Sequence, residues 1–336
     1  MSVNWSCWDS ANENSMIQVS VIIPTFRRPQ SLSRCLLALE RQSFPRDAYE
    51  VIVVSDGPDE ISELIVPDFI KGDQRFIFLQ TPLKKGPAAA RNFGWKKANG
   101  SLIAFTDDDT LPDRHWLNAI WKAYNGEKLI AYSGRIKVPL PLRPTDYEKN
   151  TAGLETAEFV TANCCCTKAA LEKVGGFDEQ FAMAWREDSD LYFKLIEANI
   201  PVVQLPDALV VHPVRYAPWG VSIKEQKKGM FNALLYKKFP QLYRQKIQRL
   251  PAWNYYVMVI CVLIFIVAIG WQIKWLTVLA VAGWLVLYMI FSHKRLRNTS
   301  RSVDHVAEML VTSACIPFIS VYWQLYGALK YRVFFM

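Results

Sequence analysis

Three consecutive carboxylates, Asp107, Asp108 and Asp109, directly follow the short apolar segment 102–106. Like charges side by side repel each other, so such a run needs a compensating charge. A divalent cation is one candidate, because Mg²⁺ and Mn²⁺ bind one or two carboxylates and complete their shells with phosphate and water. In an extended segment Asp107 and Asp109 point the same way, so one could hold the ion and the other contact ribose or the ion's water. The alternative is a turn that the aspartates stabilise.

A second acidic group lies further along the chain, in the segment Trp185-Arg-Glu187-Asp188-Ser189, just before a helical pattern. A helix start favours an ionised carboxylate, and an aromatic neighbour supplies an apolar wall. Asp188 is therefore suited to accept a proton from a hydroxyl whose oxygen attacks an anomeric carbon. The alternative is a helix cap, which fits Asp188 or Ser189 equally well. Trp185 could stack on a sugar face or belong to the core.

Two further groups follow apolar segments. Lys84-Lys85-Gly86 forms a basic turn before an alanine-rich helical pattern at 88–98, which makes an anion-friendly surface. Asp56 follows the apolar segment 51–55 and precedes Gly57. It could accept a hydrogen bond from a nucleobase or only stabilise the turn.

The elements that must position these residues read as an α/β domain with a mixed, largely parallel sheet. The predicted strands alternate with helical patterns, and ligands of such sheets bind at the carboxyl ends of the strands. The acidic groups should therefore meet in one crevice. The proline-containing segment 140–156 is predicted to be a loop that could border the acceptor site. The predicted strands are 19–23, 51–55, 76–79 and 102–106.

The hydrophobic content of 51% is high for a wholly soluble protein, and the excess is concentrated at residues 253–291. The segments 255–271 and 276–291 are near the lower limit of a bilayer span, which predicts a transmembrane helical hairpin. Basic residues flank both ends, which places those ends and the catalytic domain on the cytoplasmic side of a membrane. The third apolar segment, 306–326, could span, dip in or lie flat.

The predicted organisation has five parts, and the seven cysteines are expected to be reduced small hydrophobes. The basic stretch before the hairpin could lie beside the membrane or form an ordinary surface helix. The five parts are a disordered leader at 1–16, an α/β domain at 17–220, a basic amphipathic juxtamembrane region at 221–252, the hairpin at 253–292, and a basic loop with a third membrane-associated helix at 293–336.

Taken in order, these segments resemble the family 2 glycosyltransferases, which have the GT-A fold. Six motifs over residues 17–215 carry the resemblance, and their order is far more specific than any one of them. They are Val21-Ile-Ile-Pro24-Thr25-Phe-Arg27, Val51-Ile-Val-Val-Ser-Asp56-Gly57, Lys85-Gly-Pro-Ala-Ala-Ala-Arg91-Asn92-Phe-Gly94, Ala104-Phe-Thr-Asp107-Asp108-Asp109, Val174-Gly175-Gly176-Phe177-Asp178-Glu179 and Glu187-Asp188.

The resemblance implies a nucleotide-diphospho-sugar transferase of the inverting type, with Asp188 as the base and Asp109 as the ligand of Mg²⁺ or Mn²⁺. His212 is either a second metal ligand or structural. A UDP-sugar is the expected donor. The expected acceptor is a glycan or a lipid-linked hydroxyl in cell-envelope polysaccharide or glycolipid synthesis. The implied donor-binding residues are Pro24, Thr25, Arg27, Asp56, Arg91, Asp107 and Asp108, and the implied acceptor-binding residues are Trp185 and Glu187.

The QxxRW motif of processive synthases is absent, since the nearest match is Gln226-Lys-Lys-Gly229. A single-transfer enzyme is therefore expected. Two alternatives stay open: a membrane-tethered nucleotide-sugar binding or scaffold protein without turnover, and a sugar nucleotidyltransferase. The net charge of +8 does not predict nucleic-acid binding, because the basic residues cluster around the membrane segment.

Overall fold

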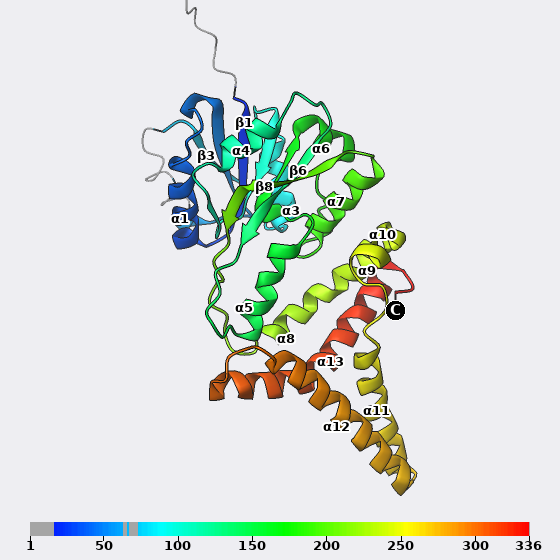
Figure 1. Ribbon diagram of the computed structural model, residues 1–336. Coiled ribbons are helices and arrows are strands. Elements are labelled where there is room, and N and C mark those ends of the chain that lie inside the picture. The colour runs from blue at the N-terminus through cyan, green and yellow to red at the C-terminus, as the bar shows by residue number, and fades with distance from the viewer. Residues whose placement is uncertain (1–16, 63–65, 67–72, 336) are drawn as a thin grey trace, which may run out of the picture.

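The computed structural model describes residues 17–62, 66 and 73–335. The predicted leader, 1–16, lies outside the described residues. Figure 1 shows an α/β domain at the top, a helical hairpin at the foot, and a layer of helices between them.

Among the described residues, eight strands form one mixed sheet in the order β3-β2-β1-β4-β7-β6-β8-β5. The first four pair in parallel, β7 is antiparallel to both β4 and β6, β8 is parallel to β6, and β5 is antiparallel to β8. All four predicted strands are confirmed. The strands are β1 (Val19–Thr25), β2 (Tyr49–Ser55), β3 (Phe76–Gln80), β4 (Leu102–Phe105), β5 (Leu111–Pro112), β6 (Ala131–Lys137), β7 (Cys164–Thr167) and β8 (Val202–Val211).

Helices cover both faces of the sheet, because side chains alternate along each strand. On β1, Val21 and Ile23 belong to the core under α1 (Pro29–Glu40) and α4 (Trp116–Ala123). Ile22 faces the other core, under α3 (Pro87–Trp95), α6 (Lys168–Val174) and α7 (Glu187–Glu197). The backbone of α3 lies so close to the sheet that a Cβ on Gly94 would come within 2.8 Å of Ile22 Cγ2.

The three consecutive cysteines form β7, and the prediction that they are free and buried is confirmed. Cys165 faces one core, and Cys164 and Cys166 face the other. They therefore pack as small hydrophobic side chains.

The prediction of a loop at 140–156 is wrong, because this segment contains α5 (Asp146–Thr151) followed by the 3₁₀ helix η2 (Ala152–Thr156). A capping box starts α5. Thr145 Oγ1 accepts the Glu148 N–H at 3.2 Å, and the Glu148 carboxylate accepts the Thr145 N–H at 2.6 Å. The Thr-x-x-Glu pattern was the signal for this helix. The other 3₁₀ helices described in the α/β domain are η1 (Arg46–Ala48) and η3 (Thr161–Asn163).

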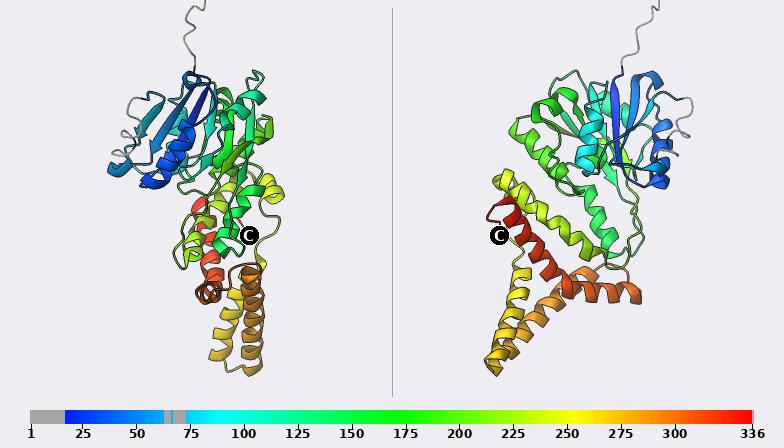
Figure 2. Two further views of the ribbon diagram at one scale, coloured as in Figure 1. Left: turned by 60° about the vertical axis from the view of Figure 1, so that its left-hand side comes forward. Right: turned by 180° about the vertical axis from the view of Figure 1, so that it is seen from behind.

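Past β8 the chain is helical, and α11 packs beside α12 as a helical hairpin, whose crossing of a membrane stays a prediction. Figures 1 and 2 show these two helices projecting away from the α/β domain. Among the residues that the structure describes, three helices, α11, α12 and α13, are long and apolar enough to cross a membrane. The elements are α8 (Val221–Glu225), η4 (Gln226–Gly229), α9 (Met230–Lys238), α10 (Pro240–Lys246), α11 (Trp253–Gly270), α12 (Lys274–Leu296) and α13 (Val303–Tyr331).

The third apolar helix differs from the hairpin. The most apolar window of α13 is 39% buried, against 11% for α11 and for α12. Pro317 lies inside α13, and in Figures 1 and 2 the helix bends and returns along α9. Its exposed face is apolar, with Val311 51% and Tyr322 58% exposed, whereas its buried face combines the polar Thr312 and Ser313 with apolar residues such as Ile316. An apolar outer face, with polar residues only on the buried side, suits a helix in contact with lipid.

The stretch before the hairpin is neither a simple surface helix nor a purely membrane-bound one. Phe231 and Leu235 of α9 belong to a core that includes Phe181 and Phe193 of the α/β domain. Trp323 of α13 packs against the same core. This core joins the α/β domain to the helical layer below it.

A buried ion pair makes a second connection. Arg295, at the end of α12, donates to Asp146 of α5 at 2.8 Å and to Thr312 of α13 at 2.7 Å. Arg295 also contacts Ser222 of α8 at 3.1 Å. One side chain therefore connects the hairpin, α13 and the α/β domain.

Candidate functional site

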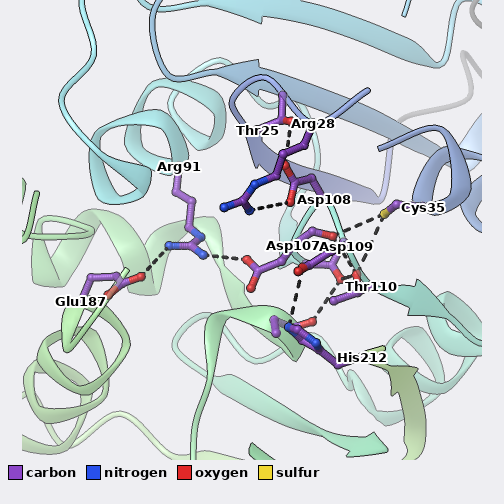
Figure 3. A network of polar contacts seen from close by, with 12 residues as sticks. Thr25, Arg28, Cys35, Arg91, Asp107, Asp108, Asp109, Thr110, Glu187 and His212 are labelled. Atoms are coloured by element: carbon purple, nitrogen blue, oxygen red, sulfur yellow. Dashed lines mark hydrogen bonds and ion pairs between the residues drawn. The ribbon is translucent and has the colours of Figure 1, made fainter. Parts of the chain in front are cut away.

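The three consecutive aspartates point in different directions from the end of β4, as Figure 3 shows. Asp108 accepts hydrogen bonds from Thr25 Oγ1 at 2.8 Å and from Arg28 Nη1 at 3.2 Å. Burial raises the pKa of Asp108 to about 6, against the opposing effect of Arg28. Asp108 thus connects the end of β1 to the turn after β4.

Asp107, Asp109 and His212 form a group that could hold a metal ion. One ligand atom from each lies within 4.8 Å of the others. His212 Nε2 is 3.6 Å from Asp109 Oδ1, and Arg215 forms an ion pair with Asp109 Oδ2. Neither Asp109 oxygen accepts a hydrogen bond from the described part of the chain. Arg215 gives Asp109 part of its counter-charge, and two carboxylates with an imidazole form a ligand set that fits Mg²⁺ or Mn²⁺.

Arg91, on α3, lies between the two acidic groups. It donates to Asp107 at 2.7 Å and to Glu187 at 3.2 Å, as Figure 3 shows. Burial raises the pKa of Asp107, but Arg91 and His212 outweigh it and hold that pKa below the ordinary value. For Glu187 burial prevails over Arg91 and raises the pKa to about 7.

Asp188 lies in the first turn of α7. It accepts the N–H of Ser189 at 2.6 Å and the Ser189 hydroxyl at 3.2 Å. Burial raises the pKa of Asp188, while Arg186 and the bonds from Ser189 oppose the rise. A carboxylate with a raised pKa is a better proton acceptor near neutral pH.

One cavity of about 1050 Å³ is lined by a member of each acidic group. Asp107 and His212 line it on one side, and Asp188 and Trp185 line it on another. The cavity continues beneath the α/β domain, where α5, α8 and α9 form its walls. Its far end is lined by His305, Glu308, Met309, Ser320 and Gln324 of α13. His305 is buried there, and its Nε2 has no hydrogen-bond partner among the described residues.

The other predicted donor residues lie at the ends of β1 and β2. Pro24 and Thr25 are the last two residues of β1, and both are buried. Arg27 adopts a positive φ of 53°, and its N–H donates to Asp59. Asp56 accepts the N–H groups of Lys85 at 2.8 Å and Gly86 at 2.9 Å, so it stabilises the turn before α3. Contact of Asp56 with a nucleobase stays a prediction.

The two predicted acceptor residues have different surroundings. Trp185 is 38% exposed, and its Nε1 donates to Asn232 Oδ1 at 3.1 Å. Glu187 is buried against Arg91. Both line the cavity beside Asp188.

Three parts of the site were not predicted from the sequence. Arg215 had a local signal, because it is a basic residue shortly after His212. Asn232 had no signal, since it lies far from Trp185 in the chain. The polar face of α13 was visible as Glu308 and Thr312 in an apolar segment, yet its direction depends on tertiary packing.

Comparison with known proteins places the α/β domain among sugar transferases. The profile described as "Glycosyl transferase family 2" matches residues 20–174. Glycosyltransferase AglE of Haloferax volcanii is 26% identical over 219 residues, which cover 62% of this chain and 70% of that protein. The pre-mycofactocin glycosyltransferase of Mycobacterium tuberculosis is 31% identical over 59% of this chain and 43% of its own length.

A solved structure shows the same fold over nearly the whole chain. It is the mannosyltransferase PcManGT from Pyrobaculum calidifontis, in complex with GDP-Man and Mn²⁺. The match has a TM-score of 0.56 at 17% identity and covers 97% of this chain and 90% of that one. At this identity the likeness describes the fold alone.

Proposed function

We propose that this chain, whose α/β domain matches the family 2 glycosyltransferase profile over residues 20–174 and which has apolar C-terminal helices, is a metal-dependent inverting enzyme with a lipid-linked acceptor. The observation that carries the proposal is the shared cavity. Asp107, from the metal-binding group, and Asp188, the candidate base, line the same space. Donor and acceptor can therefore meet between them.

On the donor side, Asp107, Asp109 and His212 would hold Mg²⁺ or Mn²⁺. When bound, the ion neutralises the charge that develops on the leaving diphosphate. Arg215 is close enough to Asp109 to contact the same phosphates. Pro24, Thr25 and Arg27 border the proposed nucleotide site, and a UDP-sugar is the first donor to test.

On the acceptor side, Asp188 removes the proton from the acceptor hydroxyl as its oxygen attacks the anomeric carbon. The new carbon–oxygen bond forms as the bond to the nucleoside diphosphate breaks, and the diphosphate leaves with the electron pair. Attack opposite the leaving group inverts the anomeric centre. The raised pKa of Asp188 suits this proton transfer.

The far end of the cavity supports a lipid-linked acceptor. It is lined by α13, whose opposite face is apolar and exposed. A head group inside the cavity could thus stay attached to a lipid at the membrane surface. Basic residues at both ends of the hairpin favour a cytoplasmic active site in a membrane that contains α11 and α12.

A screen of nucleotide sugars tests the proposal. The full chain in detergent should hydrolyse one of them slowly and be stabilised by it against heat, both only with Mg²⁺ or Mn²⁺. Stabilisation without turnover, with and without membrane-extracted acceptor, would instead favour the binding protein. Release of pyrophosphate from a nucleoside triphosphate and a sugar phosphate would favour the nucleotidyltransferase.

A further inference from the structure

Arg186 differs from every other arginine or lysine that lines the cavity. Within the described residues, Arg186 forms no ion pair, although Asp188 is only two positions away in the sequence. The other four cavity cations are all paired with carboxylates. The pairs are Arg91 with Asp107 and Glu187, Arg215 with Asp109, Lys228 with Glu225, and Lys246 with Glu158.

The guanidinium of Arg186 is held in place by neutral groups. Its Nε donates to Asn232 Oδ1 at 2.9 Å, and the same oxygen accepts the Trp185 indole N–H. The guanidinium carbon lies 4.6 Å from the centroid of the Trp185 ring. These contacts use Nε and one face of the group, and no described residue accepts a hydrogen bond from Nη1 or Nη2.

The backbone adds a further constraint. Arg186 precedes α7 in a left-handed conformation with a φ of 75°, which is unfavourable for a residue with a side chain. The conformation directs the side chain toward α9, where Asn232 lies. An arginine therefore occupies a backbone conformation that a glycine would adopt with less strain.

A cation in a half-buried site without a direct ion pair is costly, because it has lost part of its hydration, and the carboxylates of Asp188 and Glu187 act on Arg186 only from beyond ion-pair distance. Burial indeed lowers the pKa of Arg186 below its ordinary value. An arginine with two free nitrogens in a fixed fork is well suited to a phosphate, which it can bind through two parallel hydrogen bonds.

We propose that Arg186, positioned by Asn232 and Trp185, binds the phosphate through which the acceptor is attached to its lipid. This proposal rests on the proposed function and specifies its acceptor. Since Arg186 and Asp188 are two positions apart and line one cavity, the phosphate would lie near the reacting hydroxyl. The lipid chain then leaves the cavity toward α13.

Binding of geranylgeranyl phosphate to the full chain in detergent tests this assignment. EDTA is present, so that the Asp107 and Asp109 group holds no divalent cation to attract phosphate. Arg186→Gln should weaken binding about tenfold or more, and Arg186→Lys less. The control Lys224→Gln removes an exposed charge outside the cavity and should bind as the wild type does. Thermal unfolding checks that each variant is folded.

Two further probes identify the part of the ligand that is recognised. Geranylgeraniol, which lacks the phosphate, should bind the wild type and Arg186→Gln with equal affinity. Inorganic phosphate should bind the wild type far more weakly than the lipid phosphate does. Equal affinity of both phosphates would overturn the lipid assignment, and unchanged lipid-phosphate binding by Arg186→Gln would overturn the role of the arginine.

Parallel measurements separate this proposal from the proposed function. Arg186→Gln should keep its metal-dependent nucleotide binding, measured with Mn²⁺ in place of EDTA. If the substitution weakens nucleotide binding and spares the lipid phosphate, Arg186 serves the donor and the inference fails. If the wild type binds no nucleotide sugar, the proposed function fails whatever the lipid phosphate does.

Discussion

The carboxylates of Asp107 and Glu187 meet on a single guanidinium, that of Arg91, at 2.7 Å and 3.2 Å. Asp107 belongs to the candidate metal group, and Glu187 directly precedes the candidate base. One buried side chain on α3 therefore sets the spacing between the two halves of the proposed reaction.

Arg91→Lys should lower the rate of sugar transfer about 10²-fold, because a lysine cannot bond to two carboxylates in the same fixed geometry. The initial rate at saturating donor and acceptor measures the effect. Arg114→Lys, an exposed change of the same kind, is the control. Equal rates for both variants would show that the bridge does not position the reacting groups.

Asp188→Asn should reduce transfer by about 10² to 10⁴-fold, since the amide keeps the shape of the side chain but accepts no proton. Metal-dependent nucleotide binding should be nearly intact. Asp207→Asn, at an exposed position of β8, should behave as the wild type. Unchanged turnover in Asp188→Asn would reject its assignment as the base.

Asp109→Ala should remove the dependence of nucleotide affinity on metal. Calorimetric titration with a nucleoside diphosphate, with and without Mn²⁺, measures it. The wild type should bind more tightly with the ion, and the variant should show one affinity in both conditions. A variant that still responds to Mn²⁺ would place the ion elsewhere.

The pH dependence of transfer follows from the raised pKa of Asp188. The base works only when it is ionised, so the rate is full above its pKa and falls as the pH is lowered through it. We expect the acidic limb of kcat/KM to lie above 3.8, the ordinary value for aspartate. A profile that is flat down to pH 4 would contradict a buried carboxylate as the base.

Arg295→Met should destabilise the protein by about 3–5 kcal/mol, because it leaves Asp146 buried without its partner. Unfolding in detergent should show a lower Tm. The double variant Asp146→Leu with Arg295→Met removes both charges and should recover much of the loss. A single variant as stable as the wild type would mean that solvent already reaches this pair.

The first half of the sheet could be predicted because its strands are continuous apolar runs and their signal is local. The motifs after those strands could also be recognised in the sequence, so both acidic groups were expected in one crevice. The strand β5 could not be predicted, since two residues carry no periodicity and pair only because β8 lies beside them.

The contacts that complete the site depend on distances that no local pattern encodes. Asn232 meets Trp185 and Arg186 only because α9 packs under α7. The direction of Asp108, away from Asp107, follows from its bonds to Thr25 and Arg28. By contrast, α5 was missed although its capping box is written in the sequence.

The position of α13 in the chain has a consequence for biogenesis. Translation proceeds from the amino end, so the α/β domain and the hairpin leave the ribosome before the residues that line the far end of the cavity. A nascent chain that stops before 303 has its acidic residues in place but lacks one wall around them. On the proposed function, α13 therefore adds the last wall of the cavity after both helices of the hairpin have been made, and a partly synthesised chain lacks a complete acceptor site.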